Sequence, residues 1–137
     1  MPPLEPSADY PLGTRRPDLI KTPSGAALED INLDQLRAGV IAGEDIRATS
    51  ETLLLQAEIA AATGRDQLAE NLRRAAELTR VPDDVVLAVY TALRPGRSTA
   101  TALEDWAVAM ETEFRAPSVA AFIREAKAVY LNRGLVE

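Results

Sequence analysis

Few residue types in this sequence could carry chemistry. It contains no histidine and no cysteine, which removes imidazole bases, thiolate nucleophiles and the common zinc ligand sets. Any reaction would have to use carboxylate, lysine, tyrosine or serine side chains. The seven glycines are scattered at expected helix ends and form no phosphate-binding loop. We therefore predict no catalytic, cofactor-binding or metal-binding residue in this chain.

Asp83 and Asp84 are the acidic pair that comes nearest to a catalytic arrangement, because two carboxylates can act as general acid and base. Neighbouring side chains on a helix point about 100° apart, however, so the sequence does not bring these groups together. Both residues follow Pro82, which suits a first helical position, and negative charge stabilises a helix N-terminus. This role explains the pair, and an independent carboxylate enzyme is the weakest hypothesis for the chain.

Arg94 and Arg97 flank Pro95 and Gly96 and form a small cationic corner. Two hypotheses remain open for this corner. The guanidinium groups could bind a carboxylate of a partner protein. Alternatively, they could neutralise the C-terminal end of the helix that precedes them.

Composition indicates one globular domain with an acidic balance of charge. The 137 residues are 47% hydrophobic and carry a formal net charge of −6, whereas nucleic acid is bound by clustered lysine and arginine. No apolar run approaches the roughly 20 residues of a membrane helix. The acidic, proline-rich start also lacks the basic and apolar regions of a signal peptide. We expect a cytoplasmic protein that binds neither nucleic acid nor membrane.

The chain is organised around one apolar segment, residues 82–93. Between Val85 and Leu93 only Thr91 is polar, and prolines on either side mark a helix start and a helix stop. A helix without a polar face must be covered on every side. We therefore predict that Pro82 to Leu93 forms the central helix of a bundle.

Amphipathic helices are predicted on both sides of this segment, because apolar residues recur at helical spacing and capping residues mark the ends. They cover residues 32–37, capped by Asn32 and ended by Gly39; 50–63, capped by Thr49 or Ser50 and stopped by Gly64; 65–78; 98–114, capped by Ser98, with Trp106 in its apolar stripe; and 117–133, opened by Pro117 and ended by Gly134. Short loops make neighbouring helices antiparallel. The predicted fold class is all-α, an irregular bundle of about five helices with an extended proline-rich N-terminal arm.

The N-terminal arm, residues 1–30, is distinct from the helical domain of residues 31–137. It holds six of the nine prolines and shows no helical periodicity, and residues 1–8 are predicted to be disordered. One hypothesis is a flexible tail, since isolated exposed apolar residues are common. The other is an arm that lies on another subunit. The candidate partner-interface residues are Tyr10, Pro11, Leu12, Leu19 and Ile20 in the arm, and Arg94 and Arg97 in the cationic corner.

Several short motifs occur in order along the chain. They are Asp9-Tyr10-Pro11-Leu12, Thr22-Pro23-Ser24-Gly25, Asp45-Ile46-Arg47, Gly64-Arg65-Asp66, Val81-Pro82-Asp83-Asp84, Tyr90-Thr91-Ala92-Leu93-Arg94-Pro95 and Ala120-Ala121-Phe122-Ile123-Arg124-Glu125-Ala126. Together they resemble the small (γ) subunit of adenosylcobalamin-dependent diol and glycerol dehydratases. The resemblance covers about Asp9 to Arg133, and several ordered blocks are more specific than any single motif.

The resemblance implies a dimer of αβγ heterotrimers. In that family a barrel-shaped large (α) subunit holds substrate and a metal ion, and cobalamin lies between the large and medium (β) subunits. An adenosyl radical abstracts hydrogen from a 1,2-diol or glycerol, the hydroxyl group migrates, and loss of water leaves an aldehyde. The small subunit contributes no catalytic residue, and a chain without histidine cannot supply an axial imidazole to cobalt. We expect adenosylcobalamin and the metal ion to be bound elsewhere in the complex.

The sequence departs from the family pattern at two places. Many members carry an aromatic residue where this chain has Gly96, and some carry a long N-terminal extension linked with bacterial microcompartments. This chain has only a few residues before Tyr10, which gives no support for such packaging. The resemblance favours a non-catalytic small subunit needed to assemble a propanediol or glycerol dehydratase, a lyase. The alternative is a free-standing acidic helical adaptor that binds a partner helix or peptide.

Overall fold

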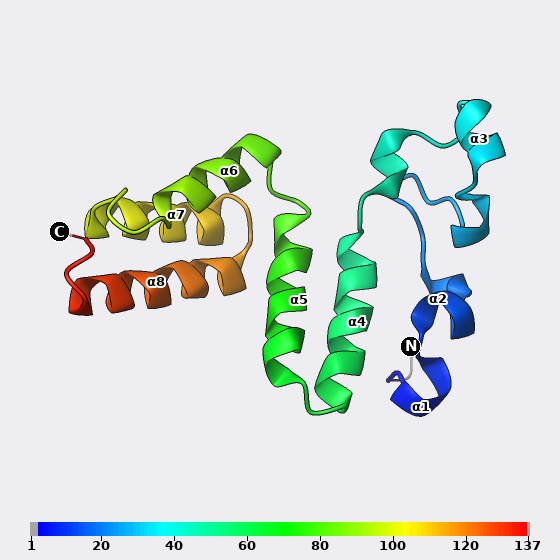
Figure 1. The fold of residues 1–137 in the computed structure, drawn as a ribbon, viewed down its shortest axis with the longest axis horizontal. Coiled ribbons are helices and arrows are strands. Elements are labelled where there is room, and N and C mark those ends of the chain that lie inside the picture. The colour runs from blue at the N-terminus through cyan, green and yellow to red at the C-terminus, as the bar shows by residue number, and fades with distance from the viewer. Residues whose placement is uncertain (1–2, 137) are drawn as a thin grey trace. The chain divides into compact units, whose positions relative to one another are not determined.

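A computed structural model describes residues 3–136 and divides the chain into two units between Thr79 and Arg80 (Figure 1). Over the described residues, the elements are α-helices and short 3-10 helices, and the β-type pairing is limited to one antiparallel bridge between Lys21 and Ala27. The predicted all-α class is confirmed. The boundary predicted at residue 30 falls inside the first unit, and the two units are described separately below.

The centre of the first unit is a hairpin of two helices, α4 (Ser50–Ala62) and α5 (Asp66–Leu78), which lie side by side in Figure 1. Small side chains allow two helix backbones to approach closely, and both helices bury alanines. The buried alanines are Ala57 and Ala60 in α4, and Ala69 and Ala76 in α5. The alanine-rich sequence of this segment therefore sets how tightly the hairpin packs.

The ends of the helices in the first unit follow the predicted capping signals. The Thr49 hydroxyl accepts a hydrogen bond from the Thr52 amide at 3.3 Å and begins α4. In the same way, the Asn32 side chain accepts from the Gln35 amide at 3.0 Å. Gly64 has a φ of +74°, a left-handed conformation that favours glycine, and it ends α4. These predictions are confirmed.

The N-terminal arm is less extended than predicted. It forms one-turn helices separated by loops: α1 (Pro6–Asp9), α2 (Leu12–Arg15), and the 3-10 turns η1 (Pro17–Leu19) and η2 (Leu28–Asp30). Prolines open two of these turns, where a missing N–H removes no hydrogen bond. The proline content therefore prevents long helices in the arm but permits single turns.

The arm packs on α4 through a small apolar cluster. Leu4 and Leu12 are buried against Ile59, and Leu19 and Ile20 pack partly buried against the same cluster. The predicted disorder of residues 1–8 is wrong for residues 3–8, because Leu4 is fixed by this packing; residues 1 and 2 lie outside the described residues. The cluster is also the reason why the arm belongs to the first unit.

A second short helix and a 3-10 turn complete the first unit. They are α3 (Leu33–Arg37) and η3 (Gly43–Ile46). Gly39, with a φ of +73°, follows α3 as predicted. Asp45 is buried within η3, and its carboxylate ties this turn to the preceding loop.

Asp45 is held by two backbone amides. Its Oδ2 accepts a hydrogen bond from the Ala42 amide at 2.9 Å, and its Oδ1 accepts one from the Ser24 amide at 3.3 Å. The buried Thr22 hydroxyl accepts from the Ala26 amide at 3.0 Å in the same loop. A hydrogen bond from the Ser24 side chain and then that from the Ala42 amide lower the pKa of Asp45 below its ordinary value, because they stabilise the charged form.

We expect Asp45→Asn to destabilise the fold at neutral pH, because an amide has one acceptor oxygen for two backbone donors. The pKa is lower in the folded state, so the carboxylate stabilises the fold above its ordinary pKa of 3.8 and loses this effect as pH falls through the lowered value. Urea unfolding at about pH 7 and about pH 3 should give a difference between wild type and variant that shrinks in acid. Replacement of the exposed Asp105 by asparagine is the control. An equal Asp45 difference at both pH values would contradict this assignment.

The second unit consists of three helices, α6 (Asp83–Ala92), α7 (Ala100–Thr112) and α8 (Pro117–Asn132). α7 begins one residue later than predicted, because the cap is the Thr99 hydroxyl, which accepts from the Ala102 amide at 3.1 Å. Ser98 was therefore the wrong cap, since two neighbouring hydroxyl residues carry the same capping signal.

The core of the second unit lies between α7 and α8. Its largest fully buried side chains are Leu103, Met110 and Ile123. Buried alanines fill the space around them: Ala107 in α7, Ala116 before α8 and Ala120 in α8. The predicted apolar stripes of both helices thus form one interface, although Trp106 lies only half-buried at its edge.

The α6 helix is not covered on every side, and this prediction is wrong. Val89 is its one buried residue among those described, whereas Leu87 is 65% and Tyr90 is 69% exposed. The α7–α8 hairpin packs mainly on itself, so it leaves part of the apolar surface of α6 facing solvent. The helix is thus apolar on every side, but only part of that apolar surface is buried within the chain.

Ion pairs join the exposed sides of α7 and α8. Arg124 Nε lies 3.0 Å from Glu104 Oε1, and Arg124 Nη2 lies 2.9 Å from Glu111 Oε2. Lys127 also pairs with Glu104. Lys127 and then Arg124 lower the pKa of Glu104 through these hydrogen bonds. The network links the two helices outside their apolar core.

Candidate partner interface

Residues 3–136 bring together no group of three or more His, Cys, Asp or Glu side chains that could hold a metal ion. Asp83 and Asp84 both lie in the first turn of α6, where negative charge stabilises the helix. None of the described helices is both long enough and apolar enough to cross a membrane. The candidate partner-interface residues lie in the arm and in the cationic corner.

The candidate interface residues of the arm fall into two groups. Leu12 is buried, and Leu19 and Ile20 are half-buried in the cluster on α4, so much of their apolar surface is already used within the chain. Tyr10 is 60% exposed, and Pro11 is exposed as well. Tyr10 and Pro11 are joined by a cis peptide bond and lie at the edge of a groove.

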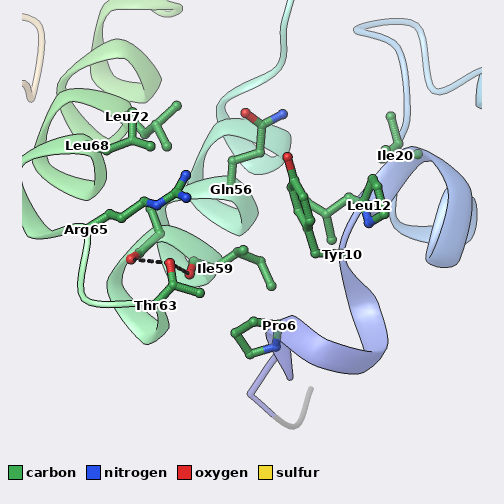
Figure 2. A pocket seen from close by; sticks show the side chains of 13 residues that line it. Pro6, Tyr10, Leu12, Ile20, Gln56, Ile59, Thr63, Arg65, Leu68 and Leu72 are labelled. Carbon is green, nitrogen blue, oxygen red and sulfur yellow. Dashed lines mark hydrogen bonds between the residues drawn. The ribbon is translucent and has the colours of Figure 1, made fainter.

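The groove has a volume of about 500 Å³ and lies within the first unit, between the arm and the α4–α5 hairpin (Figure 2). The arm forms one wall, α4 forms the floor, and α5 forms the opposite wall. The residues that line it are Pro6, Tyr10, Pro11, Leu12, Gly13 and Ile20 from the arm, Gln56, Ile59, Ala60 and Thr63 from α4 and its end, and Arg65, Leu68 and Leu72 from the start and body of α5. The lining is mostly apolar, as in ligand and peptide sites.

Few polar groups face this groove. The Thr63 hydroxyl is already engaged, because it donates to the carbonyl oxygens of Ile59 and Ala60 at 3.1 Å and 3.0 Å. The Gln56 amide and the Tyr10 hydroxyl belong to residues on the floor and on the arm wall of the groove. Arg65 is the one charged residue among the described lining residues, and its side chain extends into the groove between α4 and α5. The groove thus combines apolar walls with one cation.

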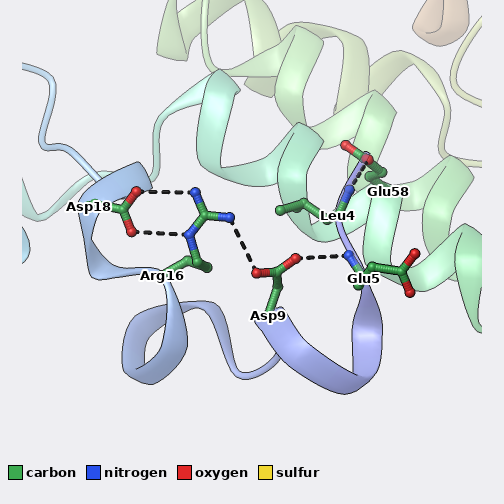
Figure 3. Close-up of polar contacts among 6 residues, drawn as sticks. All are labelled: Leu4, Glu5, Asp9, Arg16, Asp18 and Glu58. Carbon is green, nitrogen blue, oxygen red and sulfur yellow. Dashed lines mark hydrogen bonds and ion pairs between the residues drawn. The ribbon is translucent and has the colours of Figure 1, made fainter. Parts of the chain in front are cut away.

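A hydrogen-bonded clamp holds the arm wall in place (Figure 3). Arg16 lies 3.2 Å from Asp9 and 3.1 Å from Asp18, and it bridges the two ends of the arm helices. The Leu4 amide donates to Glu58 Oε1 at 2.7 Å and so attaches the start of the arm to α4. The Glu5 amide and then Arg16 lower the pKa of Asp9 through hydrogen bonds, and Arg16 lowers the pKa of Asp18. These contacts within the first unit therefore hold the arm in place as one wall of the groove.

The cationic corner of Arg94 and Arg97 lies in the second unit, and both residues are exposed. The turn that follows α6 is anchored to α8, since the Tyr130 hydroxyl donates a hydrogen bond to the Leu93 carbonyl at 2.6 Å. Gly96 has a φ of +71°, a conformation that suits glycine at this position. Beside it lies a shallow hollow of about 420 Å³, lined by Gly96, Arg97, Ser98, Thr99, Gly134, Leu135 and Val136. The left-handed conformation of the turn explains why glycine occupies position 96. The turn also leaves the guanidinium groups of Arg94 and Arg97 accessible to solvent.

The structure adds surface residues that sequence reasoning did not single out. Leu87 and Tyr90 are three residues apart in α6, so they lie on one side of the helix and form an exposed apolar face. Arg65 and Leu68 contribute to the groove, but in the sequence they look like an ordinary helix start. No local signal could have identified them, because the opposite wall comes from residues more than 40 positions away in the chain.

Comparison with known proteins gives a consistent result. Residues 6–137 match a family model described as dehydratase small subunit. The chain is 48% identical over 125 residues to a propanediol dehydratase small subunit of Citrobacter freundii, which covers 91% of this chain and 73% of that protein. It is 46% identical over 126 residues to a propanediol dehydratase small subunit of Salmonella typhimurium, covering 92% of this chain and 73% of that protein.

Proposed function

Because the chain belongs to the dehydratase small subunit family, we propose that it is the non-catalytic small subunit of a diol dehydratase that acts on 1,2-propanediol. The observation that carries this proposal is the 48% identity to a propanediol dehydratase small subunit over 91% of the chain. The scarcity of reactive side chains agrees with it, since a chain without histidine or cysteine has few groups for catalysis. Glycerol is the second substrate that we propose, on the family resemblance.

We propose that the complex uses adenosylcobalamin and a metal ion, both bound by other subunits. The adenosyl group would supply a radical that abstracts a hydrogen atom from the diol. Two observations support the proposal that neither group is bound by this chain. It has no imidazole for cobalt, and its described residues gather no cluster of metal-binding side chains. We therefore derive no step of the reaction through this chain.

The proposed partners are the large and medium dehydratase subunits, in a dimer of heterotrimers within the cytoplasm. Exposed apolar side chains on both units support a role in assembly. Tyr10 on the first unit and Leu87 and Tyr90 on the second are each at least 60% exposed, and burial of such side chains favours association. Leu87 and Tyr90 extend the sequence hypothesis, which named Tyr10, Pro11, Leu12, Leu19 and Ile20 in the arm and Arg94 and Arg97 in the corner.

Co-expression tests this proposal directly. When the tagged chain is expressed with the large and medium subunits, we expect all three to purify together, and the complex with adenosylcobalamin should convert 1,2-propanediol to an aldehyde. The large and medium subunits expressed without this chain should give much less soluble complex. The tagged chain purified alone should neither bind cobalamin in a spectroscopic titration nor dehydrate the diol. Elution of the tagged chain without the larger subunits would instead favour the free-standing adaptor.

A further inference from the structure

We propose that the groove of the first unit binds a segment of a larger dehydratase subunit that carries an aliphatic side chain next to an aspartate or glutamate. This inference rests on the proposed function, because it names the partner and the chemistry of the contact. It assigns Arg65 as the residue that pairs with the carboxylate. Tyr10 and Leu68 are assigned as the apolar walls.

The apolar side chains that line the groove favour binding of an apolar side chain. Tyr10 is 60% exposed on one wall and Leu68 is 44% exposed on the other, and both face a space of about 500 Å³. Transfer of apolar surface out of water is favourable at roughly 25 cal/mol per Å². The clamp of Arg16 with Asp9 and Asp18 holds the arm wall in position, so little ordering is needed on binding.

Arg65 sets the charge of the occupant. Its guanidinium extends into the groove in Figure 2, and the residue is exposed to solvent. The other described lining residues are uncharged, and the Gln56 amide lies across the floor as a further donor. A carboxylate is the group that matches an arginine, because the planar guanidinium can form two parallel charge-assisted hydrogen bonds with it.

The net charge of the chain argues against a second copy as the occupant. Each copy carries a formal charge of −6, so two copies repel each other at long range. Arg65 is the one charged residue among the described residues that line the groove, and its positive charge attracts an acidic partner segment to this place. An acidic segment of a larger subunit meets both conditions, since its carboxylate pairs with Arg65 and its aliphatic side chain covers Tyr10 and Leu68.

Charge reversal in the assembled complex tests this assignment. Arg65→Glu and Leu68→Glu, each made in the full chain and co-expressed with the larger subunits, should weaken association at least tenfold. Arg37→Glu and Leu33→Glu on α3 are the matched controls, because these residues are exposed outside the groove, and they should change association less than twofold. Arg65→Lys should bind more tightly than Arg65→Gln, since it keeps the charge. Circular dichroism should show that all variants fold.

A photoreactive phenylalanine analogue in place of Tyr10 provides a second measurement. Illumination of the complex should link it to a larger subunit, at a peptide that contains an aspartate or glutamate beside an aliphatic residue. Crosslinks only to another copy of this chain would overturn the assignment. So would unchanged association of both glutamate variants while the wild-type chain binds the larger subunits normally. Failure of the wild-type chain itself to bind them would instead refute the proposed function, and the two failures are thus distinguishable.

Discussion

Replacement of Leu103 by alanine is expected to lower the free energy of unfolding by about 2 to 5 kcal/mol. Leu103 is fully buried between α7 and α8, so its loss removes apolar contacts and leaves a cavity. Urea unfolding of the isolated chain measures the effect. Val108→Ala on the same helix is the control, because Val108 is largely exposed and its truncation should change stability by about 0.5 kcal/mol at most. Equal effects of the two substitutions would contradict the assigned core.

The same Leu103 variant separates assembly from chemistry. A loss of this size is a large part of the roughly 5 to 15 kcal/mol that stabilises a whole domain, and binding to the larger subunits should restore part of it by mass action. Dehydratase activity in cell extracts should fall, because fewer complete complexes form. Turnover by each fully assembled, cofactor-saturated complex should stay near wild type. A clear drop in that turnover would show that the chain helps to shape the active site.

Leu12→Ala is expected to loosen the arm from α4 and to cost about 2 to 5 kcal/mol in the first unit. Leu12 is buried with Leu4 and Ile59, and it also lines the groove. Hydrogen exchange at the amides of Arg15 and Arg16 should become faster, since these amides bond to carbonyl groups at the start of α2. Under the proposed docking, association with the larger subunits should weaken as well.

Leu33→Ala is the matched control for the arm, because this leucine is 67% exposed on α3. It should leave both the exchange rates and association unchanged. If Leu12→Ala left the exchange rates of the α2 amides at their wild-type values, the arm would be fixed by other contacts. The flexible-tail hypothesis would regain support if removal of this leucine changed neither stability nor association.

Helix ends were predictable from the sequence because capping is local. The Asn32 and Thr49 caps and the Gly64 turn each depend on residues within about three positions of one another, so the pattern and the structure agree. The family was also predictable, since ordered motifs along most of the chain are shared with its members. Ser98 was misplaced by one residue only because Thr99 carries the same signal.

Burial was less predictable than secondary structure, because it depends on which elements meet. The apolar α6 was expected to be covered, yet Leu87 and Tyr90 are exposed; Trp106 was expected in the core, yet it is half-buried. An apolar residue indicates that a surface is to be covered, but it does not say whether the same chain covers it. The groove could not be predicted from the sequence either, since its walls come from segments that are distant in the sequence and meet only in the folded chain.

The half-buried position of Trp106 has a spectroscopic consequence. It is the one tryptophan of the chain, and it lies on α7 in the second unit. Indole fluorescence therefore reports on residues 80–137, whereas far-ultraviolet circular dichroism sums the helices of both units. If the two signals change at different denaturant concentrations, the units unfold independently; if they coincide, unfolding is cooperative across the whole chain. The wild-type sequence thus carries an intrinsic probe that distinguishes its two halves without any label.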